Sequence, residues 1–218
     1  MSGKRHAIID ACRRMARSGL TPGKSGNASL REGAGMLITP TGIAYEKLKP
    51  SDIVAMALDG GRPSGKRTPS SEWPFHAAIY RARPEIGAIV HCHSRFATAL
   101  ACLHRDIPAF HYMVAIAGGP SIRCAPYATF GTGALADHAV AALADGRRAC
   151  LLANHGQIAT GDTIERALDL AVEVEALAAQ YVTALGIGVP QLLDDAEMAR
   201  NIEKFRTYGQ PPRRGRPR

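Results

Sequence analysis

Apolar residues recur every three to four positions in several segments of the chain, which is the spacing of one face of an α-helix. Gly19, Pro84 and Thr132 supply stop and cap signals at the edges of these segments. The pattern predicts helices over residues 6–18, 70–83, 94–103, 132–145, 163–185 and 195–205. In the longest of them the predicted buried side consists of Ile164, Leu168, Ala171, Val172, Leu177 and Tyr181.

Short apolar runs bounded by glycine and proline predict strands between these helices. Several strands follow one another without an intervening helix, which favours a mixed or largely antiparallel sheet over a doubly wound parallel one. The predicted fold class is therefore α/β, with helices layered on such a sheet. The predicted strands cover residues 36–39, 52–58, 88–93 and 149–153, one strand after the TPGKSG turn, and short strands within 111–127.

The composition is that of an ordinary globular chain of 218 residues, with 46% apolar and 21% charged residues. We expect residues 1–210 to form a single domain with one core. The formal charge of +8 is uneven, because residues 211–218 hold four arginines and no acid. We expect this basic tail to be disordered, and a phosphate or nucleic-acid contact is the alternative.

The sequence also argues against several classes of protein. No apolar run approaches the roughly 20 residues of a membrane-spanning helix, and the body lacks the basic, aromatic-studded face of a nucleic-acid binder. The five cysteines contain no CxxC pair, which favours a reducing, cytoplasmic setting over a disulfide framework. No GxGxxG or Walker A pattern indicates a nucleotide cofactor. We expect a cytoplasmic protein with no membrane and no nucleic-acid partner.

Histidines at alternate positions of a predicted strand are the strongest chemical signal. His91 and His93 point to the same face, with Cα atoms about 6.6 Å apart, and two imidazoles at that separation can converge on one divalent ion. Cys92 points to the opposite face. His155, in an Asn-His-Gly turn after the 149–153 strand, is a candidate third ligand. Taken alone, the pattern favours half-buried histidines that hydrogen-bond the backbone over metal ligands.

The TPSSEWPFH segment places two hydroxyls and a carboxylate at the start of a predicted helix. Ser70 and Ser71 stand ahead of free backbone N–H groups, which together form a ready anion site. Glu72, expected in the first turn, is either a helix-dipole partner or a functional acid, and His76 is either a packed residue or a partner of Glu72. Two Gly-rich turns offer similar alternatives, an ordinary turn or a phosphate cradle, at residues 23–27 and 39–42.

Several short segments occur together along the chain: SGNAS, MLITPTGI, PSSEW, IVH, IPAFHYM, CAPYATFGT, NHG and TYG. Their order and spacing, from about residue 6 to residue 209, resemble the class II aldolase/adducin family. Within it they are most similar to the bacterial enzymes that act on L-fuculose 1-phosphate. The resemblance implies a three-layer α/β/α fold on a mostly antiparallel sheet. It also implies a homotetramer with active sites at subunit interfaces.

The resemblance implies roles for individual residues. Glu72 matches an acid that ligates zinc at rest and acts as acid/base once substrate arrives. Tyr112 matches a tyrosine that serves the aldehyde oxygen across a subunit boundary. The implied zinc ligands are Glu72, His91, His93 and His155. The implied substrate-phosphate residues are Asn27, Thr41, Gly42, Ser70 and Ser71, and the implied aldehyde pocket holds Phe130 and Tyr208.

The activity that the resemblance implies is a zinc-dependent aldol cleavage. A ketose 1-phosphate such as L-fuculose 1-phosphate would be split through a metal-stabilised enediolate into dihydroxyacetone phosphate and a small aldehyde such as L-lactaldehyde. Another divalent metal suits histidine and glutamate ligands as well. The alternatives on this fold are a 3-oxo acid phosphate decarboxylase, a deoxypentulose-1-phosphate aldolase, a thioribulose-phosphate dehydratase and a pentulose-phosphate 4-epimerase. Glutamate at position 72 argues against the epimerase, and the three histidines argue against a non-catalytic scaffold.

Overall fold

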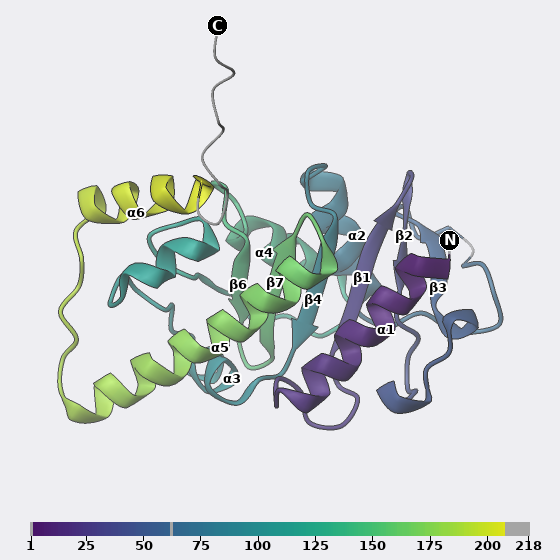
Figure 1. The fold of residues 1–218 in the computed structure, drawn as a ribbon, viewed down its shortest axis with the longest axis horizontal. Coiled ribbons are helices and arrows are strands. Elements are labelled where there is room, and N and C mark those ends of the chain that lie inside the picture. Colours follow the sequence, from purple (N-terminus) through teal and green to yellow (C-terminus); the bar gives the residue numbers. More distant parts are fainter. Residues whose placement is uncertain (1, 62, 208–218) are drawn as a thin grey trace, which may run out of the picture.

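A seven-stranded sheet forms the centre of the computed structural model, which describes residues 2–61 and 63–207 (Figure 1). The strand order is β3-β2-β1-β4-β7-β6-β5. Among these strands every pairing is antiparallel except that of β5 with β6, which confirms the predicted mixed, mostly antiparallel sheet. The strands are β1 (Asn27–Glu32), β2 (Gly35–Ile38), β3 (Val54–Ala57), β4 (Ala88–Cys92), β5 (Cys124–Ala125), β6 (Ala149–Leu152) and β7 (Gly156–Gly161).

Helices cover both faces of the sheet, so the molecule has three layers (Figure 1). Buried side chains of α1, α3 and α5 form one apolar cluster with the sheet, and those of α2 and α4 form a second cluster on the other face. The α-helices are α1 (Ser2–Arg17), α2 (Trp73–Ala82), α3 (Arg95–Cys102), α4 (Gly133–Ala142), α5 (Ile164–Ile187) and α6 (Asp195–Thr207). The 3-10 helices are η1 (Tyr45–Lys47), η2 (Pro50–Asp52) and η3 (Tyr112–Ala117).

Strand β4 shows how side chains alternate between the two faces. Val90 and Cys92 belong to the cluster under α5, whereas Ile89 belongs to the cluster under α2 and α4. His91 therefore faces α2, where its ring lies edge-on to Phe75 with centroids 5.4 Å apart. The alternation confirms that the cysteine and the histidine of this segment point to opposite faces.

The start of α2 differs from the prediction. The helix begins at Trp73 rather than at 70, and neither Ser70 nor Ser71 is its cap. Glu72 occupies the N-cap position, but its side chain makes no capping hydrogen bond. Pro74 suits the first turn, because backbone N–H groups there have no acceptor within the helix, so the missing N–H of proline costs no hydrogen bond. The Glu72 carboxylate is consequently free to turn away from the helix.

Two further segments correct the sequence prediction. Residues 112–117 form the 3-10 helix η3 instead of short strands, because the His111 side chain caps its start and Gly118 ends it in a left-handed conformation with φ 83°. Strand β7, which the prediction omits, lies between β4 and β6. Its Gln157 and Thr160 interrupt the apolar pattern, yet both are buried and hydrogen-bonded.

Helix α5 is the one helix among the described residues that is long and apolar enough, by length and composition, to cross a membrane. It packs on β7, β4 and α3, and Leu168, Ala171 and Val174 are fully buried there, so it is a core helix of this fold. Val172, predicted on the buried side, is 41% exposed. Tyr208 and residues 211–218 lie outside the described part of the chain.

Candidate metal centre

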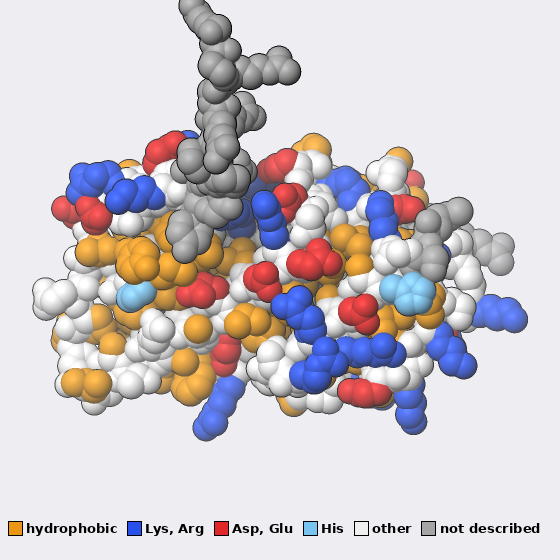
Figure 2. All heavy atoms as spheres, in the orientation of Figure 1, with side chains coloured by type: hydrophobic (Ala, Val, Ile, Leu, Met, Phe, Trp, Pro, Cys, Tyr) orange, Lys and Arg blue, Asp and Glu red, His pale blue; other side chains and the backbone are white. Residues whose placement is uncertain are grey.

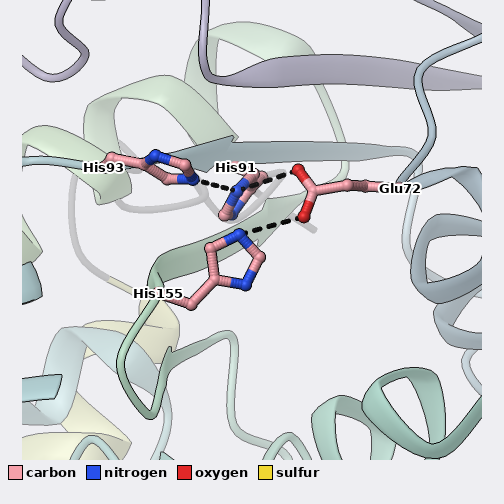
Figure 3. Close-up of side chains that lie close together, drawn as sticks. All are labelled: Glu72, His91, His93 and His155. Atoms are coloured by element: carbon pink, nitrogen blue, oxygen red, sulfur yellow. Dashed lines mark hydrogen bonds and ion pairs between the residues drawn. The ribbon is translucent and has the colours of Figure 1, made fainter. Parts of the chain in front are cut away.

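Four side chains from three separate parts of the chain meet at the end of β4 (Figure 3). His91 is the last residue but one of β4 and His93 lies just beyond the strand, His155 lies in the turn between β6 and β7, and Glu72 is the N-cap residue of α2. One ligand atom of each lies within 4.8 Å of all the others. The three imidazole centroids are 4.8–4.9 Å apart and the ring planes are inclined by 69–72° to one another. The structure therefore brings together all four predicted ligands.

A hydrogen bond outside the cluster decides which nitrogen of His91 faces its centre. The Nδ1–H of His91 donates to the backbone oxygen of Gln157 at 2.9 Å, since a carbonyl can only accept. The Nε2 of His91 is thereby left for the centre, as is usual for a metal-binding histidine. It lies 3.0 Å from Nε2 of His93 and 3.2 Å from Oε2 of Glu72.

The cluster fits a divalent cation. Oε1 of Glu72 is buried without a hydrogen-bond donor among the described residues, and Nε2 of His155 lies 3.0 Å from it outside hydrogen-bonding geometry. A cation at the centre would satisfy this oxygen and the inward-facing nitrogens together. Three imidazoles and one carboxylate suit zinc, and they suit manganese or cobalt as well.

Burial and mutual contact set the charges in the cluster. Burial raises the pKa of Glu72, but His91 and His155 beside it outweigh this effect and hold the pKa below its ordinary value. The carboxylate is therefore ionised. Burial lowers the pKa of His93 to about 4, with a smaller contribution from the neighbouring imidazoles. His93 is consequently neutral at pH 7, the form in which an imidazole binds a metal.

The Asn-His-Gly sequence of the β6–β7 turn follows from its close approach to β4. A Cβ on Gly156 would lie 2.5 Å from the Cys92 carbonyl oxygen and 2.9 Å from the His93 ring. Asn154 adopts a left-handed conformation with φ 54°, which asparagine tolerates better than most residues. Its side-chain oxygen accepts a hydrogen bond from His104 at 2.6 Å. The turn therefore holds the histidine between these two residues against the end of β4.

A family model agrees with this fold and site. The model of the class II aldolase and adducin N-terminal domain matches residues 6–182, which is most of the chain. The chain belongs to the class II aldolase family. Metal dependence is expected for the family, and the cluster of Glu72 and three histidines provides a site for the metal.

Relatives of this aldolase are similar over nearly their whole length. A 5-methylthioribulose-1-phosphate/5-deoxyribulose-1-phosphate aldolase of Rhodospirillum rubrum is 55% identical, over 94% of this chain and 92% of its own. An L-fuculose phosphate aldolase of Escherichia coli is 54% identical, over 93% and 94%. A solved structure of L-fuculose 1-phosphate aldolase has a TM-score of 0.91 at 42% identity, covering 94% of this chain and 97% of its own. The names agree on an aldolase, so this chain is a lyase, and they differ in the sugar phosphate.

The residues predicted to hold the substrate phosphate lie on adjoining segments of the aldolase. One β-bridge and two backbone hydrogen bonds join the 39–42 loop to residues 68–70, directly before Glu72. Nδ2 of Asn27 donates to Oε2 of Glu72 at 2.8 Å. Lys24 lies in the predicted 23–27 turn but is not among the predicted phosphate residues; it contacts the Gly42 carbonyl at 3.0 Å and adds a positive charge beside this loop. These contacts join the segment of Thr41 and Gly42 to the segment of Ser70 and Ser71, and they join Asn27 to Glu72.

Of the residues predicted for the aldehyde side, the two that the structure describes, Tyr112 and Phe130, are exposed. Tyr112 is 49% exposed on η3 and its ring stacks on Phe205 of α6. Within the described residues no hydrogen bond, ion pair or ring contact links it to the four ligands. Phe130 is 64% exposed, but its loop reaches the cluster side, because a Cβ on Gly131 would lie 2.8 Å from the Ser71 carbonyl oxygen. Tyr208 is outside the described residues.

His76 is fully buried and contacts Asn27, so it is connected to Glu72 through one residue rather than merely packed. Ser29 and Tyr80 continue the same chain of contacts and are absent from the prediction. Two sequence features indicate them. Asn27 and Ser29 are two residues apart and so lie on one face of a strand. His76 and Tyr80 are four residues apart and so lie on one face of a helix.

The metal-free protein is expected to lose stability as the pH falls below about 6.5. In the unfolded chain a histidine titrates near 6.5, whereas burial lowers the pKa of His76 to about 3 and that of His93 to about 4. At a pH between the native and the unfolded pKa values, the unfolded chain binds protons that the native protein does not. The unfolding equilibrium constant should therefore rise by up to about tenfold per pH unit for each histidine.

Urea unfolding of the metal-free protein between pH 7 and pH 5 measures this loss. In the variant His76→Gln the free energy of unfolding should depend less steeply on pH. The number of protons taken up on unfolding is smaller by up to one, because one of the two buried histidines is gone. A free energy of unfolding that stays constant from pH 7 to pH 5 contradicts the expectation.

Proposed function

We propose that this aldolase cleaves a ketose 1-phosphate of the L-fuculose 1-phosphate type into dihydroxyacetone phosphate and a small aldehyde such as L-lactaldehyde. The main support is the position of the predicted phosphate residues, since Ser70 and Ser71 directly precede Glu72. Two residues span at most about 7 Å. A phosphate held there would set the first three carbons of the sugar against the metal centre. The Escherichia coli relative is named for this type of substrate.

Zn²⁺ is the metal we infer, with His91, His93, His155 and Glu72 as its ligands. When bound, it supplies a Lewis acid that takes up the negative charge left as the C3–C4 bond breaks beside the C2 carbonyl. Three neutral imidazoles leave the positive charge of a bound ion undiminished. A carboxylate that can turn away leaves room for two substrate oxygens.

Glu72 moves the proton at C3. In the condensation direction its ionised carboxylate removes that proton from dihydroxyacetone phosphate, and in the cleavage direction it returns the proton to C3. Tyr112 of a neighbouring copy takes or gives the proton at the C4 hydroxyl. The phosphate residues fix the orientation of the sugar without touching the reacting atoms.

We also infer a homotetramer with its active sites between subunits. Tyr112 is half exposed, and among the described residues no hydrogen bond, ion pair or ring contact links it to the four ligands of its own chain, which suits a residue that serves a neighbouring site. Hydrophobic side chains gather over the end of the molecule formed by α6 and the C-terminal part of α5 (Figure 2), where Ile187 and Val189 are 86% and 89% exposed. A contact between copies would bury them. We place the enzyme in the cytoplasm, with residues 1–210 as one domain.

A second candidate substrate is a 5-deoxypentulose 1-phosphate or its 5-methylthio form, for which the Rhodospirillum rubrum relative is named. Such sugars share carbons 1–3 with L-fuculose 1-phosphate and differ only in the aldehyde half. The aldehyde half would contact Phe130 and the Tyr112 of a neighbouring copy. Aldol cleavage is favoured over decarboxylation, dehydration or epimerisation, because both relatives are named as aldolases.

A cleavage panel on the zinc-loaded enzyme tests the proposal. We expect release of dihydroxyacetone phosphate from L-fuculose 1-phosphate with a higher kcat/KM than from 5-deoxyribulose 1-phosphate or 5-methylthioribulose 1-phosphate. A preference of more than about tenfold for either pentulose would favour the second candidate. No cleavage of any ketose 1-phosphate, together with carbon dioxide release from a 3-oxo acid phosphate, would overturn the aldolase proposal.

A further inference from the structure

A continuous chain of buried polar side chains runs from Glu72 into the layer between β1 and α2. The amide nitrogen of Asn27 contacts Glu72 at 2.8 Å, and its amide oxygen contacts Nε2 of His76 at 2.5 Å. Nδ1 of His76 contacts the Ser29 hydroxyl at 2.7 Å, which in turn contacts the Tyr80 hydroxyl at 2.9 Å. The four residues beyond Glu72 are 0–3% exposed, so bulk water does not compete for these hydrogen bonds.

As a proposed metal ligand, the Glu72 side chain is a carboxylate that accepts hydrogen bonds, and this fixes the direction of every hydrogen bond in this chain. Glu72 can only accept, so Asn27 must turn its NH₂ group to Glu72 and its oxygen to His76. That oxygen can only accept, so Nε2 of His76 carries the proton and Nδ1 accepts from Ser29. Ser29 then accepts from Tyr80. A single arrangement of donors and acceptors satisfies the whole chain, and such bonds reinforce one another.

The fold holds the members of this chain in place from both sides. Asn27 and Ser29 lie two residues apart on β1 and point to one face. His76 and Tyr80 lie one turn apart on α2, and the Arg31 guanidinium covers the Tyr80 ring at 4.7 Å. Burial keeps His76 neutral, so it serves as donor at one nitrogen and acceptor at the other.

We propose that His76 is a positioning residue, which orients the Asn27 amide so that its NH₂ group holds the Glu72 carboxylate. The inference rests on the proposed role of Glu72. Without the donor at Nε2, the amide is free to rotate by half a turn and place its oxygen against the carboxylate. Two acceptors in contact repel each other, so Glu72 would leave the position that it shares with the histidines.

Two amide substitutions separate positioning from packing. In His76→Gln the longer side chain can still bring an N–H to the Asn27 oxygen. In His76→Asn the shorter one reaches only the position of Nδ1, where it can accept from Ser29. We expect the dissociation constant for Zn²⁺, measured by competition with a chromophoric chelator, to rise about tenfold or more in His76→Asn and less than threefold in His76→Gln. With substrate, kcat should fall in His76→Asn while KM changes less than twofold.

The background variant Glu72→Gln shows whether His76 acts through the carboxylate. There the two His76 substitutions should bind Zn²⁺ equally, because the group that the amide holds has lost its charge. Equal weakening by both substitutions with Glu72 present, or no weakening by either, overturns the inference. Since Zn²⁺ binding needs no substrate, the expected affinities together with a failed cleavage panel would reject the proposed substrate and keep the positioning role.

Discussion

Metal removal is expected to reduce cleavage of the ketose 1-phosphate by at least about 10³-fold. A Lewis acid at the centre is worth several kcal/mol to a transition state that carries new negative charge, and about 4 kcal/mol corresponds to that factor. Glu72 is itself an anion and the three imidazoles are ligands, so the cluster alone offers no replacement for the missing positive charge. Release of dihydroxyacetone phosphate before and after exhaustive chelation measures the loss.

The chelation experiment has a structural control. Adding Zn²⁺ back should restore the rate and raise the unfolding temperature, because an ion that binds only the native state stabilises it by about 2.7 kcal/mol at 100 times its dissociation constant. Circular dichroism of the chelated enzyme should stay that of the folded protein, since both apolar clusters are independent of the metal. An enzyme with less than one-hundredth of a metal ion per chain and an undiminished rate would refute the metal's role.

The placement of His91 and His93 on one strand face follows from the sequence, but their meeting with the other two ligands does not. Alternation along a strand is enough to place His91 and His93 on one face, and β4 has that alternation. Their convergence with His155 and Glu72 depends on a tight turn and on the start of a helix, which are tertiary features. From the sequence, only the family resemblance predicted that all four residues bind one metal.

Buried polar residues account for most of what the sequence analysis missed. Gln157 breaks the apolar run of β7, so the strand beside β4 was not predicted, although its backbone oxygen holds His91. Spacing places Ser29 on the strand face of Asn27 and Tyr80 on the helix face of His76, but it does not show that the Ser29 hydroxyl contacts both His76 and the Tyr80 hydroxyl. Such groups are stable only because each has a partner elsewhere in the chain, and sequence patterns do not show those partners.

The substitution Glu72→Gln is expected to lower kcat by about 10³- to 10⁴-fold, with the fold unchanged. Glutamine has the same size and can still accept the hydrogen bond from Asn27, but it cannot move a proton at C3. The histidines stay in place, so the variant should still bind Zn²⁺, more weakly. Steady-state release of dihydroxyacetone phosphate from the zinc-saturated variant measures the effect on the chemical step, apart from the effect on metal binding.

Glu175→Gln is the matched control, because it makes the same chemical change at another carboxylate of the chain. Glu175 accepts hydrogen bonds from the backbone N–H groups of Phe96 and Ala97 at 2.8 and 2.9 Å, where it caps α3. Its loss of charge should lower the free energy of unfolding by about 1–2 kcal/mol and leave kcat nearly unchanged. If Glu72→Gln instead retains kcat within threefold of the unmodified enzyme, Glu72 is only a metal ligand, and another group moves the proton at C3.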